Sequence, residues 1–171
     1  MRYDRSMPPL TLASHLRTVA TFNRTANEIV LAALRSRAED PSALASCRHV
    51  FEAEMVWYRR LSGGDANVAL FPVLGEYAME LAICADWLAE ASFGLERYAT
   101  ELPEEAFGDD FTYHNLSGQP RSNLLANVLQ HVFLHSAQYR GETLGKLAPT
   151  GPVPDIDYIF YVTGEARFGR L

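Results

Sequence analysis

Residues 124–142 form an apolar, helical run with two histidines inside it, reading LLANVLQHVFLHSAQYRGE. His131 and His135 are four residues apart, and this spacing places both imidazoles on one helix face, where they can converge on one point. At about 100° per residue, His135 falls within the stripe of Leu124, Val128, Val132 and Tyr139. An unpartnered buried polar group costs about 1–3 kcal/mol. We therefore expect a partner inside the fold for these histidines.

Three further stretches carry the same helical periodicity, so the chain is predicted to be all-α. The step Asp40-Pro41 ends the first helix and opens the second. The third is expected to start between Phe71 and Gly75, after Pro72, and Ser122 is the expected N-cap of the last. The predicted long helices cover residues 10–38, 42–61, 72–101 and 122–147.

The stretch from Phe107 to Pro120 alternates loosely between apolar and polar residues, and we interpret it as a small hairpin or an ordered loop. The tail from Asp155 to Val162 is apolar enough to dock on the body of the protein. Long helices with short connections predict an antiparallel four-helix bundle, built as a single domain over residues 1–171.

The composition is that of an ordinary globular protein, with 48% hydrophobic and 21% charged residues. The net charge of −6, without any Lys/Arg cluster, argues against a nucleic-acid partner. No apolar run approaches the roughly 18 residues of a membrane span. Cys47 and Cys84 lie in apolar helical patterns without CxxC spacing, so we expect buried free thiols in a reducing cytoplasm.

A third histidine is a candidate ligand for the same site. His49 is expected on the second helix, on the face shared with Ala45, Ala53, Val56 and Trp57. One histidine from this helix and a His-x-x-x-His pair from another can hold a zinc, nickel, iron or copper ion, with one position open for water or substrate. Alternatively, the histidines are core residues held by ordinary hydrogen bonds.

Several segments together resemble the DinB/YfiT-like superfamily, and the resemblance spans essentially the full chain. Residues 22–28, FNRTANE, resemble the family's aromatic-Asn-x-x-Ala-Asn signature, and residues 48–57, RHVFEAEMVW, resemble the segment with a ligand histidine. Residues 131–142 resemble the pattern His-x-x-x-His-x-x-His-His-Arg-Gly-Gln, and residues 155–162 resemble an Asp-x-x-x-aromatic ending.

The resemblance implies a four-helix bundle of up-down-down-up type, often dimeric, with a divalent metal on three histidines. It also implies chemistry with low-molecular-weight thiols, as in the transferases and isomerases of that superfamily. Many of its members have no assigned activity.

One departure from the family pattern concerns the third ligand. The pattern places its last-helix ligands at His135 and at the position of Tyr139, and its closing Gln is Glu142 here. His49 and His135 therefore carry over. A phenol becomes a metal ligand at neutral pH only with a large pKa depression. His131 could replace it if the metal shifts along the helix, or Tyr139 could simply hydrogen-bond its neighbours in a degenerate site.

Two classes of function follow. The protein is either a divalent-metal-dependent hydrolase or thiol-dependent transferase, using zinc, nickel or iron, or a non-catalytic dimeric module for stress response or binding. In the first case, Glu142 or Glu52 could orient a ligand histidine. The third predicted helix carries apolar residues on more than one face, among them Met79, Ile83 and Trp87, so we also expect a homodimer.

Overall fold

The computed structural model describes residues 10–64, 66 and 76–171, and within them it is mostly helical with one small sheet. The elements are α1 (Leu12–Arg35), α2 (Pro41–Leu61), α3 (Tyr77–Trp87), α4 (Phe93–Glu101), β1 (Asp110–His114), β2 (Pro120–Leu124), α5 (Leu125–Leu147) and α6 (Tyr158–Thr163). No helix in this described part is long and apolar enough to cross a membrane.

The first two predicted helices are confirmed to within a few residues. The hydrogen bonds that cap their N-termini come from residues beside each helix start. The Thr11 hydroxyl accepts a hydrogen bond from the Ser14 backbone N–H at 3.1 Å, and the Thr11 N–H donates to the Ser14 hydroxyl at 2.9 Å. Asp40 caps α2 by accepting from the backbone of Ser42 and Ala43 at 3.0 and 2.9 Å. These caps fix where α1 and α2 begin.

The third predicted helix is interrupted. α3 ends at Trp87, a π-helical segment spans Leu88–Ser92, and α4 continues from Phe93. A π segment inserts one residue into the turn and shifts the helix face that follows it. The predicted start between Phe71 and Gly75 lies outside the described residues.

The segment before the last long helix is a hairpin, the first of the two predicted alternatives. β1 and β2 are antiparallel, with Phe111 opposite Asn123. The Asn115 side chain holds the turn by accepting from the backbone of Ser117 and Gln119 at 3.0 and 2.9 Å. The predicted N-cap at Ser122 is therefore wrong, since Ser122 is paired in β2 and α5 begins at Leu125.

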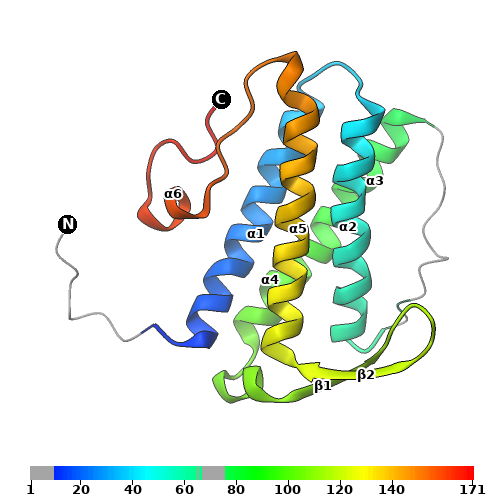
Figure 1. The fold of residues 1–171 in the computed structure, drawn as a ribbon, viewed down its shortest axis with the longest axis vertical. Helices are drawn as coiled ribbons and strands as arrows, with labels where there is room; N and C mark the ends of the chain where they lie inside the picture. The colour runs from blue at the N-terminus through cyan, green and yellow to red at the C-terminus, as the bar shows by residue number, and fades with distance from the viewer. Residues whose placement is uncertain (1–9, 65, 67–75) are drawn as a thin grey trace.

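The long helices lie side by side, with α5 packed against both α1 and α2 (Figure 1). α1 and α5 run in one direction and α2, α3 and α4 in the other, while the hairpin closes one end of the molecule. As predicted, the tail docks on the body: the rings of Tyr158 and Tyr161 lie 5.1 and 5.5 Å from that of Phe22 on α1.

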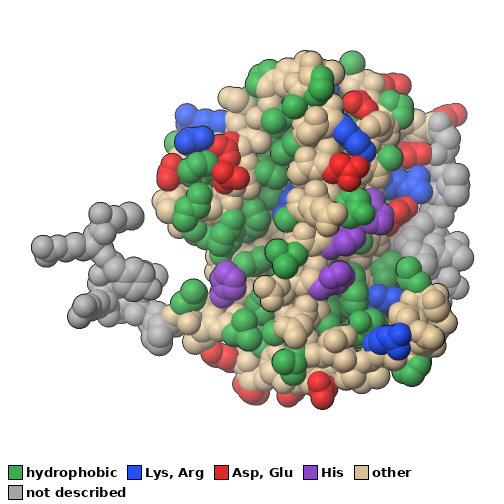
Figure 2. All heavy atoms as spheres, viewed as in Figure 1, with side chains coloured by type: hydrophobic (Ala, Val, Ile, Leu, Met, Phe, Trp, Pro, Cys, Tyr) green, Lys and Arg blue, Asp and Glu red, His purple; other side chains and the backbone are tan. Residues whose placement is uncertain are grey.

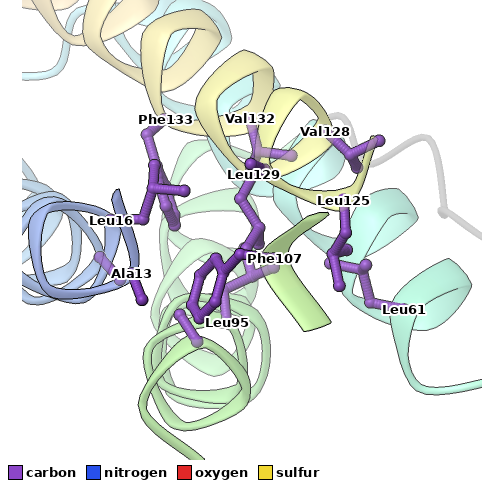
Figure 3. Packing of buried hydrophobic residues seen from close by; sticks show 13 residues of the cluster. Ala13, Leu16, Leu61, Leu95, Phe107, Leu125, Val128, Leu129, Val132 and Phe133 are labelled. Atoms are coloured by element: carbon purple, nitrogen blue, oxygen red, sulfur yellow. The ribbon is translucent and has the colours of Figure 1, made fainter. Parts of the chain in front are cut away.

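Two apolar clusters fill the interior. One lies near the hairpin, where Leu129, Phe107 and Leu95 point toward one another (Figure 3). The other lies toward the opposite end of the helices and includes Leu34 and Leu147. Polar residues of α1, α2 and α5 occupy the positions between the two clusters, so the core has a polar layer at its middle.

The buried stripe of α5 differs from the prediction. It is centred on Val132, Ser136 and Arg140, whereas His135 and Tyr139 are half-buried and Leu124 is 45% exposed. The expectation that His135 lies in the middle of the stripe is thus wrong by one helix position. Ser136 and Arg140 take the interior, and His135 lies at the edge of the stripe.

Candidate metal centre between α2 and α5

The two helices bring His49, His135 and Tyr139 together in one cluster. The ring centroids of His49 and His135 are 5.2 Å apart, and that of Tyr139 lies 4.2 Å from His49 and 4.8 Å from His135. All three side chains are half-buried at the surface where α2 meets α5. In Figure 2 most of the purple on this face is grouped where α2 meets α5, and a separate purple patch lies toward α1. The predicted juxtaposition of His49 and His135 is therefore present.

His131 lies apart from this cluster. Its ring is 5.9 Å from His135 and packs edge-on against Trp57 at 5.6 Å, and the side chain is exposed. The structure gives it no ring contact with His49. Of the two predicted third ligands, Tyr139 is thus the one that lies with both His49 and His135.

The donor atoms suit a divalent ion. His135 Nδ1 is buried and has no hydrogen-bond partner, an orphaned state that a metal bond would remove. Burial lowers the pKa of His135, and the nearby His49 and His131 lower it further, so the imidazole is neutral and able to ligate. Two imidazole nitrogens bound to one tetrahedral zinc ion lie roughly 3.4 Å apart. The ring centroids of His49 and His135 are 5.2 Å apart, so rotation of the two side chains can bring a nitrogen of each ring to that separation.

The set of strong ligands is incomplete. Among the described residues, no three His, Cys, Asp or Glu side chains converge into a group that could hold a metal ion. Beyond His49 and His135, the third position within the cluster is occupied by the phenol of Tyr139. A phenolate oxygen is a harder ligand than an imidazole nitrogen.

The carboxylates expected to orient a ligand histidine are engaged elsewhere. Glu52 accepts from Arg48 Nε at 2.7 Å. Glu142 accepts from Lys146 at 2.6 Å and from the Ser46 hydroxyl at 2.8 Å, and these hydrogen bonds lower its pKa. Within the described part of the chain, neither carboxylate is hydrogen-bonded to His49 or His135.

A buried carboxylate lies directly behind the cluster. Glu54 is 0% exposed, and its Oε1 accepts from Asn23 at 2.7 Å, Asn27 at 2.8 Å and Ser136 at 2.7 Å. Its Oε2 accepts a short hydrogen bond from the hydroxyl of Ser92. This carboxylate therefore joins α1, α2, α5 and the π segment at one point.

Arg140 supplies the compensating charge through the two asparagines. Its Nη1 donates to the side-chain oxygens of Asn23 and Asn27 at 2.6 and 2.8 Å. Burial lowers the pKa of Arg140 to about 10, which still leaves the guanidinium charged at neutral pH. Each asparagine thus donates a hydrogen bond to the buried carboxylate of Glu54 and accepts one from the buried guanidinium of Arg140. Neither charge is therefore isolated in the core.

The sequence alone does not reveal this network. Asn23, Asn27 and Arg140 lie in segments that resemble a family pattern, and Glu54 lies in the segment that resembles its ligand helix. A usable signal was present: on three helices, polar residues stand at positions whose helical spacing belongs to the buried face. Such residues are predicted to bond one another when the helices pack.

A hollow opens in front of the histidines. It has a volume of about 290 Å³ and runs along α2 from His49, past Ala53 and Trp57, to Arg60. The hairpin tip covers it with Leu116. The hollow gives a small molecule a route to the histidines. Comparison of the chain with protein-family models, with curated proteins and with solved structures found no match.

Proposed function

We propose that this chain is a DinB/YfiT-like four-helix bundle that binds a divalent ion, zinc, nickel or iron, through His49, His135 and Tyr139. The observation that carries the proposal is the cluster of these three rings around the orphaned Nδ1 of His135. The helix directions in Figure 1 follow the up-down-down-up order that the resemblance implies.

The proposed activity is that of a metal-dependent hydrolase or a thiol-dependent transferase. When bound, the ion would lower the pKa of a water molecule or a low-molecular-weight thiol and so supply a nucleophile. The chain's own residues hold the site in place. Ser136 follows His135, Arg140 follows Tyr139, and both are anchored in the Glu54 network, which fixes the face that α5 presents to α2.

His131 is the other candidate for the third ligand. Its ring would have to leave Trp57, against which it packs at 5.6 Å, and turn toward His135. Tyr139 is the third ligand that we favour, because its ring already lies 4.2 Å from that of His49 and 4.8 Å from that of His135.

A second candidate function is a non-catalytic binding module with a degenerate site. The observation in its favour is that Tyr139 stands where the family pattern has histidine, and that no group of three His, Cys, Asp or Glu converges in the described residues. In that case Tyr139 and the histidines form only a polar edge to the core.

We further propose a cytoplasmic homodimer formed through α3, with no nucleic-acid partner. Met79 on this helix is 49% exposed, while Ile83 and Trp87 are only partly buried. A second copy would cover these residues.

The test is the metal content of untagged protein purified without a chelating resin. The enzyme proposal predicts one divalent ion per chain and a rise in melting temperature with added Ni²⁺ or Zn²⁺. His135→Ala should abolish both, because two remaining ligands hold a divalent ion poorly, whereas His114→Ala on the hairpin should change neither. Metal-free protein that gains no stability from either ion would favour the binding module.

A further inference from the structure

Arg60 lies at the far end of the hollow that begins at His49, and in the described part of the chain its guanidinium has no ion pair or hydrogen bond. Its guanidinium carbon lies 4.6 Å from the ring of Trp57 and 5.3 Å from that of Tyr113. Its Nε is buried without a hydrogen-bond partner, and burial lowers the pKa of the group. The cation is thus partly desolvated, and among the described residues it is compensated by the aromatic faces of Trp57 and Tyr113.

The hollow has a distinct chemistry at each end. His49 and His135 lie at one end and Arg60 at the other, with Ala53, Val56 and Trp57 between them as an apolar wall. Glu52, the carboxylate among the described residues of this wall, is neutralised by Arg48 at 2.7 Å. A second hollow, on the hairpin side, is also lined by Arg60. The guanidinium is therefore reachable from two openings.

The spacing along α2 sets the shape of a suitable ligand. His49 and Arg60 are eleven residues apart, a rise of about 16 Å along a helix. The Arg60 guanidinium lies over the ring of Trp57, three residues back along α2, so it is nearer to the imidazole of His49 than the backbone rise alone suggests. A ligand that touches both ends must therefore be elongated, with an apolar body against Trp57.

We propose that Arg60 is the carboxylate-binding end of a site for elongated organic acids, whose apolar body lies on Trp57 and whose other end reaches His49 and His135. The guanidinium fork matches a carboxylate with two parallel hydrogen bonds, and these would give its unpartnered N–H groups their acceptors. This subsite rests on the proposed metal centre only for the reaction at the other end. Acid binding at Arg60 itself requires no metal.

The test uses 4-phenylbutyrate and its uncharged analogue 4-phenylbutanamide, titrated calorimetrically into the full chain without metal and with one equivalent of Ni²⁺. The parent protein should bind the acid about tenfold more tightly than the amide under both conditions. Arg60→Gln should remove that preference and leave amide binding within about twofold. Arg60→Lys, which keeps the charge but loses the fork, should give an intermediate preference.

The matched control is Arg121→Gln, which removes the same charge from an exposed arginine of β2. It should leave the preference for the acid intact. Equal binding of acid and amide by the parent protein would overturn the proposal, a result that does not depend on how any variant folds. Acid binding that requires Ni²⁺ and survives Arg60→Gln would also overturn it, since the carboxylate would then be on the metal. If Ni²⁺ does not bind but the preference for the acid remains, the proposed metal centre is wrong and the acid subsite is supported.

Discussion

Ser136 on α5 donates a hydrogen bond of 2.7 Å to the Glu54 carboxylate on α2, and the residue before Ser136 is His135. Consecutive helix residues point about 100° apart, so one residue is fixed in the core while its neighbour faces the edge. The same holds for Arg140 and Tyr139. The buried polar layer therefore sets the rotation of α5 that places His135 and Tyr139 opposite His49.

Glu54→Gln should destabilise the fold by about 2–4 kcal/mol, because it leaves the buried Arg140 without a compensating charge. The amide nitrogen would also face side chains that donate to Glu54 in the parent. Urea unfolding measures the effect. Glu52→Gln, on the same helix but partly exposed and paired with Arg48, should cost less than about 1 kcal/mol. Equal losses in the two variants would contradict the network's role.

Gly94→Ala should destabilise α4 although alanine is the better helix former. A Cβ at Gly94 would overlap the ring of Tyr58 on α2, so helix or ring must move. Overpacking costs about 1–3 kcal/mol, against a propensity gain of about 1 kcal/mol.

Gly141→Ala is the matched control, since a Cβ at that position of α5 meets nothing within 4 Å. It should be neutral or stabilise by up to about 1 kcal/mol in thermal or urea unfolding. A stabilised Gly94→Ala variant would show that α2 and α4 leave room for a Cβ beside the ring of Tyr58.

The two cysteines should be unreactive in the native protein. Cys47 and Cys84 are 1% and 0% exposed, and a hydrogen bond between their thiols, together with burial, raises the pKa of Cys47 well above its usual value. Since the thiolate is the reactive form, Ellman's reagent at pH 7.5 should titrate neither thiol in the folded chain. In denaturant it should titrate both. Rapid reaction of either thiol before unfolding would contradict this packing.

The proposed homodimer should depend on α3. Sedimentation at micromolar concentration should give a dimer, and the double variant Met79→Glu, Ile83→Glu should give a monomer, since a buried unpaired carboxylate opposes association. Leu134→Glu, at a leucine that is 63% exposed on α5, should remain dimeric. A monomeric parent would end the dimer proposal.

The sequence predicts the parts of this fold that local signals control. The step Asp40-Pro41 marks the start of α2, and the loose alternation from Phe107 to Pro120 allows the hairpin as one of two alternatives. The π segment at Leu88–Ser92 was missed because an apolar pattern on several faces hides an inserted residue. The start of α5 was missed because β2 extends to Leu124 by pairing with β1, which is not a local interaction.

The candidate site, too, is predicted only in part by local sequence signals. Helical spacing places His135 and Tyr139 on neighbouring turns, and the inward placement expected for His49, together with the family pattern, predicts that it lies near them. The choice between Tyr139 and His131 depends on Trp57 and Tyr113, whose rings pack together at 5.0 Å and hold His131 away from the cluster. That contact exists only once the hairpin lies against α2, so periodicity could not reveal it.

The most direct test of the central claim is the stoichiometry of Ni²⁺ or Zn²⁺ bound by the parent, by Tyr139→Phe and by Tyr139→His. The proposed site should hold one ion per chain in the parent, bind it more weakly after loss of the phenol oxygen, and bind it more tightly when histidine completes the triad. His131→Ala, measured alongside, should leave the parent's binding unchanged. An unmetallated parent that takes up no added ion, together with clear binding by Tyr139→His, would contradict the account and show a metal site lost by one substitution.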